Sequence, residues 1–229
     1  MPAPISVIIP VRNAVKDLPA CLSHLVDGLE AGLIREVIVS GVPSNDPCRE
    51  IAEETGAVWI EGEAGRGVQL MRGAVAARGE WLLFLHADTW LEEGWTNHAK
   101  AHLAADQDRA GAFCLAFRSR TWRAGWVAAL ANLRARFLGL PYGDQGLLIS
   151  RRLYDEIGGY EPIPLMEDVS IAKRLGRKRL ALIQSRALTS GAKQMRDGWI
   201  TRSLKNILLV LRYHMGASPE KLARAYYDT

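Results

Sequence analysis

A histidine and an aspartate, His86 and Asp88, follow the most apolar run of the sequence, Trp81 to Leu85. Because they are two residues apart on an extended backbone, their side chains point to the same side and could act together. Carboxylate oxygens are the ligands that Mg²⁺ and Mn²⁺ prefer, and such a cation commonly bridges phosphate oxygens. Capping of the next helix is the alternative role for Asp88, and the residues alone favour neither role.

Two other polar pairs could contribute chemistry. Glu167 and Asp168 follow a proline-rich segment and begin a predicted helix, where a carboxylate could remove a proton from a hydroxyl group. Adjacent carboxylates at a helix start more often only cap it, and the residues alone favour that plainer role. Asp144 and Gln145 lie between glycines in a predicted loop, which could bind a hydroxylated compound or form an Asx-turn.

A glycine-rich stretch at 62–67 precedes another predicted helix. It is not a dinucleotide fingerprint, because Leu70 occupies the position of the third glycine, and no Gly-Lys-Ser/Thr ending is present. The sequence therefore disfavours dehydrogenase and P-loop functions. Arg66 could still meet a diphosphate near the helix N-terminus, with a solvated arginine as the alternative.

Alternating apolar segments predict how these residues are positioned. Buried strands are expected at 5–9, 36–39, 58–60 and 81–85, with helices between them at 17–29, 46–56 and 67–78. Such alternation predicts an α/β fold with a mostly parallel sheet, right-handed crossovers and ligands beyond the carboxyl ends of the strands. The second half is mixed, with strands expected at 111–117, 147–150 and 180–184 and a long helix whose one face carries Trp122, Trp126, Leu130, Leu133 and Phe137.

The composition of the 229 residues excludes several classes of protein. Apolar residues make up 48% and charged residues 24%, which argues against a disordered or fibrous chain. A net charge of +4 tolerates an anionic ligand but is too small to predict a nucleic-acid partner. Three widely separated cysteines indicate a reducing compartment. We expect no signal peptide, and no apolar run approaches the ~20 residues of a membrane-spanning helix, which predicts a cytoplasmic protein.

Several motifs taken together resemble a known family. The run from Ile5 to Asn13 (ISVIIPVRN), His86-Ala-Asp88 and Glu167-Asp168 resemble the family-two inverting glycosyltransferases, which have the GT-A fold. The segments 65–69, 83–89, 141–146 and 164–169 are similar to a bacterial subgroup associated with radical-SAM and selenium-related genes. The resemblance covers nearly the whole chain, and it implies a GT-A-like, Rossmann-like three-layer sandwich.

The resemblance implies transfer of a sugar from a nucleotide-diphosphate donor to a hydroxyl acceptor with inversion. Asp88 and His86 would hold Mg²⁺ or Mn²⁺, Asp168 would be the general base, and Glu167 would lie beside it. The expected donor contacts are Pro10, Arg12, Asn13, Arg66, Gln69 and Ala87. The expected acceptor contacts are Gly143, Asp144 and Gln145.

The chain departs from the family pattern at three places. His86 replaces the first acidic residue of the metal motif, which predicts weaker metal binding. Gly41 lies where most members have an acidic residue that binds the nucleobase, and Met71 replaces an asparagine of the subgroup. A second interpretation is therefore that the protein is a non-catalytic relative that binds sugar nucleotides or carbohydrates. A nucleotidyltransferase is a further alternative, although the segment 10–13 is not the glycine-rich loop expected of one.

The chain is expected to form a GT-A domain at 1–196 and a helical extension at 197–229 packed on it. The predicted helix 199–215 carries one apolar stripe, which we expect to pack on the catalytic domain. An interfacial helix that reaches a lipid-linked acceptor at the inner membrane face, and a homodimer contact, are the alternatives. The stripe consists of Ile200, Leu204, Ile207, Leu208, Leu211 and Met215.

Overall fold

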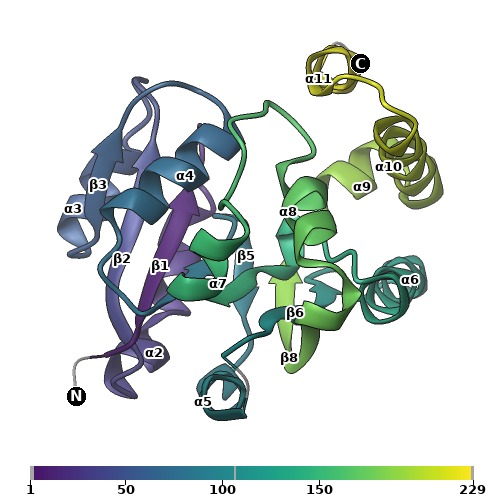
Figure 1. The fold of residues 1–229 in the computed structure, drawn as a ribbon. Helices are drawn as coiled ribbons and strands as arrows, with labels where there is room; N and C mark the ends of the chain where they lie inside the picture. Colours follow the sequence, from purple (N-terminus) through teal and green to yellow (C-terminus); the bar gives the residue numbers. More distant parts are fainter. Residues whose placement is uncertain (1–2, 106, 228–229) are drawn as a thin grey trace.

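The protein forms an α/β fold around one mixed sheet (Figure 1). The structure is a computed structural model that describes residues 3–105 and 107–227. Within these residues the sheet has eight strands in the order β3-β2-β1-β4-β7-β6-β8-β5. The strands are β1 (Ile5–Pro10), β2 (Ile34–Gly41), β3 (Val58–Glu61), β4 (Trp81–Phe84), β5 (Thr89–Leu91), β6 (Ala110–Phe117), β7 (Leu147–Ser150) and β8 (Leu180–Thr189).

The four strands predicted in the first half are parallel neighbours. β1 pairs with β2 on one side and β4 on the other, and β2 pairs with β3. In this register Pro10 lies opposite Ser40, and Gly41 lies opposite Glu61, so the carboxyl ends of three strands are level. β7 joins β4 in the antiparallel direction and connects this half to β6. The predicted α/β architecture is confirmed.

Helices cover both faces of the sheet, giving the expected three layers. Odd-numbered residues of β1 pack in one apolar cluster with α1, α3 and α5, while Ile8 packs in a second cluster with α4, α7 and α8. Figure 1 shows α4, α7 and α8 in front of the sheet. The helices are α1 (Leu18–Ser23), α2 (Val26–Glu30), α3 (Cys48–Glu54), α4 (Arg66–Ala76), α5 (Trp95–Ala105), α6 (Trp122–Leu138), α7 (Arg151–Glu156), α8 (Glu167–Leu175), α9 (Ala192–Asp197), α10 (Trp199–His214) and α11 (Pro219–Tyr227), with 3₁₀ turns η1 (Gly143–Gln145) and η2 (Arg177–Arg179).

The structure differs from the expectation in three elements: one strand is additional, one strand is longer, and one helix is divided. The sequence indicates no strand at Thr89–Leu91, but this segment pairs with the end of β8, about a hundred residues later in the chain. β8 itself continues five residues beyond Gln184, past a register irregularity opposite β6. The helix expected at 17–29 is divided into α1 and α2. The two strand differences depend on pairing with distant segments, which a local pattern does not contain.

The expected packing of the apolar stripe on α10 is wrong. Trp199, Arg202 and Leu209 are the residues that α10 buries, and Leu209 packs in one apolar cluster with Leu165 and Met166, directly before α8. The six stripe residues lie on the other side of the helix and are exposed. In the described part of the chain, no helix is long and apolar enough to cross a membrane.

Candidate active site

Asp88 lies in the bend between β4 and β5, at the carboxyl edge of the sheet. β4 ends at Phe84, and pairing of β5 with β8 begins at Thr89, so His86, Ala87 and Asp88 make the connection. The bend is closed by the backbone N–H of Thr89, which donates to the carbonyl oxygen of His86 at 3.1 Å. Asp88 is partly exposed, whereas Ala87 is buried beneath it. The expected donor contact of Ala87 stays a prediction.

Asp168 lies in the first turn of α8 and is held by two backbone donors. The N–H of Gly143 donates to its Oδ2 at 2.8 Å, and the N–H of Val169 donates to its Oδ1 at 2.8 Å. Met166, the residue directly before α8, has a φ of 70°. A left-handed conformation in a non-glycine residue is uncommon and costs free energy, so surrounding packing must hold this turn in place.

We call the segment 141–146 the acceptor loop, after the acceptor contacts expected of it. Gly143 brings this loop against both segments predicted to be catalytic. A Cβ atom at this position would lie 2.6 Å from the His86 Nε2 atom and 3.6 Å from the Asp168 Oδ2 atom. The first distance is shorter than atoms tolerate, so a side chain at position 143 would displace the His86 imidazole from its place beside the loop. The structure thus brings His86, Gly143 and Asp168 together.

Gln145 supports the loop from beneath and does not reach the cleft. Its side chain is fully buried, its Nε2 atom donates to the carbonyl oxygen of Phe113 at 3.0 Å, and its Oε1 atom accepts from the N–H of Tyr142. The expected contact between Gln145 and an acceptor is corrected on this basis, because an acceptor could not reach a side chain enclosed by β6. Its amide instead holds the shape of the loop.

Asp144 adds a poorly compensated carboxylate to the site. Its Oδ1 atom is enclosed and has no hydrogen-bond partner among the described residues. Burial raises the pKa of Asp144 from its ordinary 3.8 to about 6, and the nearby Arg134 guanidinium opposes the shift. Asp168 and Asp88 also raise this pKa by their negative charge, so the three carboxylates act on one another electrostatically.

Replacement of Asp144 by Asn is expected to stabilise the protein more at pH 8 than at pH 5. The pKa of Asp144 is higher in the folded than in the unfolded state, so its ionisation lowers stability as the pH rises from about 4 to above 6. The gain in unfolding free energy should be about 3 kcal/mol at pH 8 and roughly half of that at pH 5. Urea unfolding at both pH values measures it. A gain that does not change with pH, or one equalled by Asp155→Asn on the exposed side of α7, would contradict this account.

Glu167 is buried beside Asp168 and pairs with Arg66. The Arg66 Nη1 atom lies 3.2 Å from Glu167 Oε1, although these residues are 101 positions apart. Burial raises the pKa of Glu167, the Arg66 guanidinium opposes the shift, and Asp168 adds to it. The Oε2 atom of Glu167 is enclosed with no hydrogen-bond partner in the described part of the chain. Arg66 is therefore drawn to the acidic pair at the start of α8.

The segment after β1 lies at the same edge of the sheet. Pro10 ends the strand, and Arg12 and Asn13 are exposed beyond it. Asn13 has a φ of 55°, which turns the chain away from the strand direction. Gln69 lies below this segment and donates from Nε2 to the carbonyl oxygens of Val11 and Ser40, at 2.8 and 2.7 Å. Because Gln69 is buried and these bonds occupy its amide nitrogen, it joins β1 to β2, and its expected donor contact is corrected to this positioning role.

The end of β2 is closed where the family pattern has an acidic residue. A Cβ atom on Gly41 would lie 2.1 Å from the indole of Trp59, so the Trp59 ring covers this position. Arg72 donates from Nη2 to the Gly41 carbonyl oxygen at 2.5 Å. Gly41 itself offers no carboxylate, and the polar groups near this edge are the Arg72 guanidinium, backbone atoms, and the carboxylates of Glu61 and Glu63 close to Arg72.

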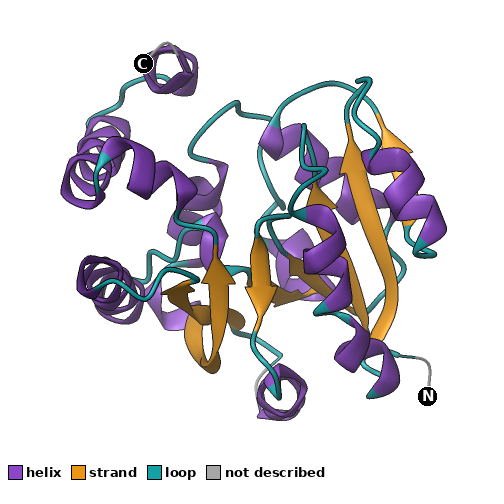
Figure 2. Cartoon of the chain, turned by 180° about the vertical axis from the view of Figure 1, so that it is seen from behind, coloured by secondary structure: helices purple, strands orange, loops and turns teal. Residues whose placement is uncertain are grey.

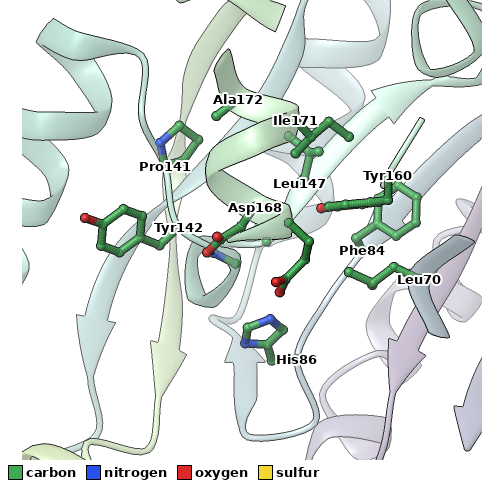
Figure 3. Close-up of a pocket in the computed structure, with 13 residues that line it drawn as sticks. Leu70, Phe84, His86, Pro141, Tyr142, Leu147, Tyr160, Asp168, Ile171 and Ala172 are labelled. Atoms are coloured by element: carbon green, nitrogen blue, oxygen red, sulfur yellow. The ribbon is translucent and has the colours of Figure 1, made fainter. Parts of the chain in front are cut away.

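Two cavities adjoin Asp168. The first is lined by His86, Tyr142 and Gly143 together with Glu167 and Asp168. Figure 3 shows the side chains of His86, Tyr142 and Asp168 around it, contributed by three separate segments of the chain. The second lies on the other side of the acidic pair and is lined by α8, α10 and α11, with contributions from Arg66, Tyr142, Leu165, Met166, Glu167, Asp168, Val169, Asn206, Leu209, Val210 and Tyr226.

Sequence reasoning missed two arginines near the carboxylates. Arg118, directly after β6, donates to Asp17 and to the carbonyl oxygen of Asp88, and it stacks 4.1 Å over the ring of Trp90. Arg134 in α6 stacks 3.3 Å over Tyr142 and donates to the Leu140 carbonyl oxygen. The position of Arg118 after a strand was a usable signal, but nothing in the local pattern distinguished Arg134 from a surface residue of a helix.

Comparison with known proteins identifies the class to which this fold and site belong. Glucosyl-3-phosphoglycerate synthase from Mycobacterium tuberculosis, solved with Mn²⁺, UDP and glucosyl-3-phosphoglycerate, superposes with a TM-score of 0.60 at 19% identity, over 90% of this chain and 79% of that one. Mannosyl-3-phosphoglycerate synthase from Rubrobacter xylanophilus gives 0.60 at 18% identity, over 90% and 74%. TarS from S. aureus gives 0.65 at 15% identity, over 94% and 40%. These likenesses establish a GT-A-like fold.

The family follows from the sequence. The family described as glycosyl transferase family 2 matches residues 6–155, which is more than half of the chain, and this protein belongs to it. The match spans the first-half strands, the His86–Asp88 bend and the acceptor loop. No curated protein matches the chain by sequence. Membership of the radical-SAM-associated subgroup stays a prediction from its motifs.

Proposed function

We propose that this protein is an inverting glycosyltransferase that moves a sugar from a nucleotide-diphosphate donor to a hydroxyl acceptor. The observation that carries the proposal is the position of Asp168. Its carboxylate is held by two backbone N–H groups, lines both cavities, and faces the same loop glycine as His86. Asp88 lies in the bend between β4 and β5. The site therefore combines a carboxylate that can take a proton with a carboxylate suited to binding a cation.

Asp168 would act as the general base. Inversion requires the acceptor hydroxyl to attack the anomeric carbon from the face opposite the leaving diphosphate, and a carboxylate on the acceptor side takes the hydroxyl proton as the new bond forms. The Gly143 and Val169 N–H groups fix the carboxylate orientation. Glu167, enclosed behind it and paired with Arg66, would shape the acceptor side.

The donor would lie along the carboxyl ends of β1, β2 and β4. Pro10, Arg12 and Asn13 border this edge, and Arg66 lies at the N-terminus of α4, where a diphosphate is favoured. Gln69 holds the edge together from beneath. Since Gly41 has no carboxylate and the Trp59 ring covers its position, we expect binding of UDP and GDP to differ by less than about tenfold.

The residues present fit a divalent cation with few protein ligands. In the described part of the chain no group of three His, Cys, Asp or Glu side chains converges as a complete metal site. Mg²⁺ commonly takes one or two carboxylates together with substrate phosphates, so a partly exposed Asp88 with His86 nearby suits that arrangement. Mg²⁺ or Mn²⁺ bound there would neutralise charge developing on the leaving diphosphate.

A screen of nucleotide sugars tests this function. Nucleotide release and sugar transfer should be measured for UDP- and GDP-sugars with Mn²⁺ and with chelator, and the anomeric configuration of any product should be read by NMR. We expect Mn²⁺-dependent turnover of at least one donor, with inversion. Nucleotide-sugar binding without turnover of any donor would favour a non-catalytic binding relative, and a retained anomeric configuration would exclude the proposed role of Asp168.

A further inference from the structure

Two helices of this protein, α6 and α10, expose large apolar side chains, and the residues that α6 buries are all alanines. α6 turns Ala124, Ala128, Ala131 and Ala135 inward, while Trp122, Trp126, Leu130, Leu133 and Phe137 are all at least half exposed. A helix that only packs on its own domain would place its largest apolar residues in the core. We define the outer surface of α6 together with the exposed stripe of α10 as the α6–α10 face.

The two stripes belong to one side of the molecule. α6 and α10 contact each other, and Trp199 at the start of α10 packs with Ala128 and Val127 of α6. Figures 1 and 2 show both helices along the same side of the protein, far from β3. Each stripe lies opposite the residues with which its helix contacts the domain. The face is larger than the scattered exposed apolar residues that monomeric proteins normally carry.

The charge of the α6–α10 face indicates which kind of partner binds it. α6 and α10 contain six of the chain's 29 lysines and arginines and none of its 25 aspartates and glutamates, so the remainder of the chain carries a small net negative charge. Arg123, Arg136, Lys205 and Arg212 are exposed and flank the two stripes. Arg134 and Arg202 instead bind within the protein. Exposed cations beside an apolar stripe complement an anionic lipid surface.

A second copy of the chain is a poorer occupant. In a two-fold dimer the same patch meets itself, which would bring these cations together with no acidic side chain of either helix to pair with them. Trp122 and Trp126, by contrast, suit the boundary between headgroups and acyl chains. We propose that the α6–α10 face is a docking surface for an anionic lipid bilayer, on which both helices lie parallel to the membrane plane.

The face is connected to the site. Arg134 joins α6 to Tyr142 in the acceptor loop, and Asn206, Leu209 and Val210 of α10 line the second cavity together with Asp168. If the proposed function holds, docking brings the acceptor side of the site to the membrane, where a lipid-linked hydroxyl acceptor would lie. Membrane binding itself requires no donor, acceptor or metal, so its test is independent of the test of glycosyl transfer.

Sedimentation with vesicles tests the proposal. The full chain should be mixed with vesicles of phosphatidylcholine alone or with added phosphatidylglycerol, at low and high salt. We expect sedimentation with the anionic vesicles and release at high salt. The double variant Trp126→Ser, Leu211→Ser should lower the partition coefficient at least about tenfold, whereas Val75→Ser, at an 86% exposed position of α4, should leave it unchanged. Lys205→Gln with Arg212→Gln should lower it about fivefold for each cation.

Charge-matched variants provide the second control. Arg35→Gln with Lys100→Gln removes two exposed cations from β2 and α5, outside the face, and should change the partition coefficient less than the Lys205 and Arg212 pair. Circular dichroism confirms that each variant is folded. Failure of the wild type to sediment with anionic vesicles, or equal sedimentation of the Trp126→Ser, Leu211→Ser variant, overturns the proposal. A wild-type dimer that this variant dissociates would assign the face to a second copy instead.

Discussion

Replacement of Asp168 by Asn should lower the turnover number for glycosyl transfer by a factor of about 10² to 10⁴, the range that a positioned general base contributes. The asparagine amide has nearly the same shape as the aspartate carboxylate. Its oxygen can still accept from the Gly143 N–H, which in the wild type donates to Asp168 Oδ2 at 2.8 Å. The loss should therefore arise from the missing proton acceptor, with the loop still in place. Steady-state kinetics with a transferable donor, together with titration of UDP, measure the two effects separately.

Asp155→Asn is the matched control, because Asp155 lies in α7 and is exposed. It should leave the turnover number and the affinity for UDP unchanged. If Asp168→Asn retains the full turnover number with a hydroxyl acceptor, another group must take the proton. If it loses affinity for UDP as strongly as turnover, the side chain supports the donor site and its assignment to the acceptor side is wrong.

Replacement of Asp88 by Asn should abolish the dependence of UDP binding on Mn²⁺. Asp88 is the carboxylate in the bend between β4 and β5, and its side chain makes one weak internal contact, a 3.5 Å bond from the Thr89 hydroxyl. The substitution should therefore remove the proposed cation ligand at little cost to the fold. We expect affinity for UDP in Mn²⁺ to fall by about 10-fold to 100-fold or more, because a neutral amide is a weak ligand for a hard cation.

Calorimetric titration of UDP with Mn²⁺ and with chelator provides the measurement. Asp27→Asn, an exposed aspartate of α2, should behave as the wild type. His86→Ala should show an intermediate loss if the imidazole contributes to cation binding. Unchanged Mn²⁺ dependence in Asp88→Asn would place the cation on other carboxylates, and the enclosed Asp144 would be the next residue to replace.

The strands that carry the site were predictable because their patterns are local. The β-branched run at 5–9 and the apolar run at 81–85 became β1 and β4, paired side by side, so Asp88 emerges where the sequence expected it. The roles of Gln69 and Gln145 were not predictable. Each amide bonds to backbone at least 29 residues away, and a glutamine beside a glycine-rich motif looks the same in sequence whether it faces a ligand or the core.

The sequence by itself determined the alternation of strands and helices, the residues at the strand ends, and the apolar stripe on each of two helices. These follow from periodicity, because a stripe is a property of one helix. Only the tertiary structure decided which face of each helix is buried. α6 turns its alanines to β6, and α10 turns Leu209 to the domain, so both stripes remain outside. The physical reason is that burial depends on what lies across a contact, and those partners come from segments far away in the chain.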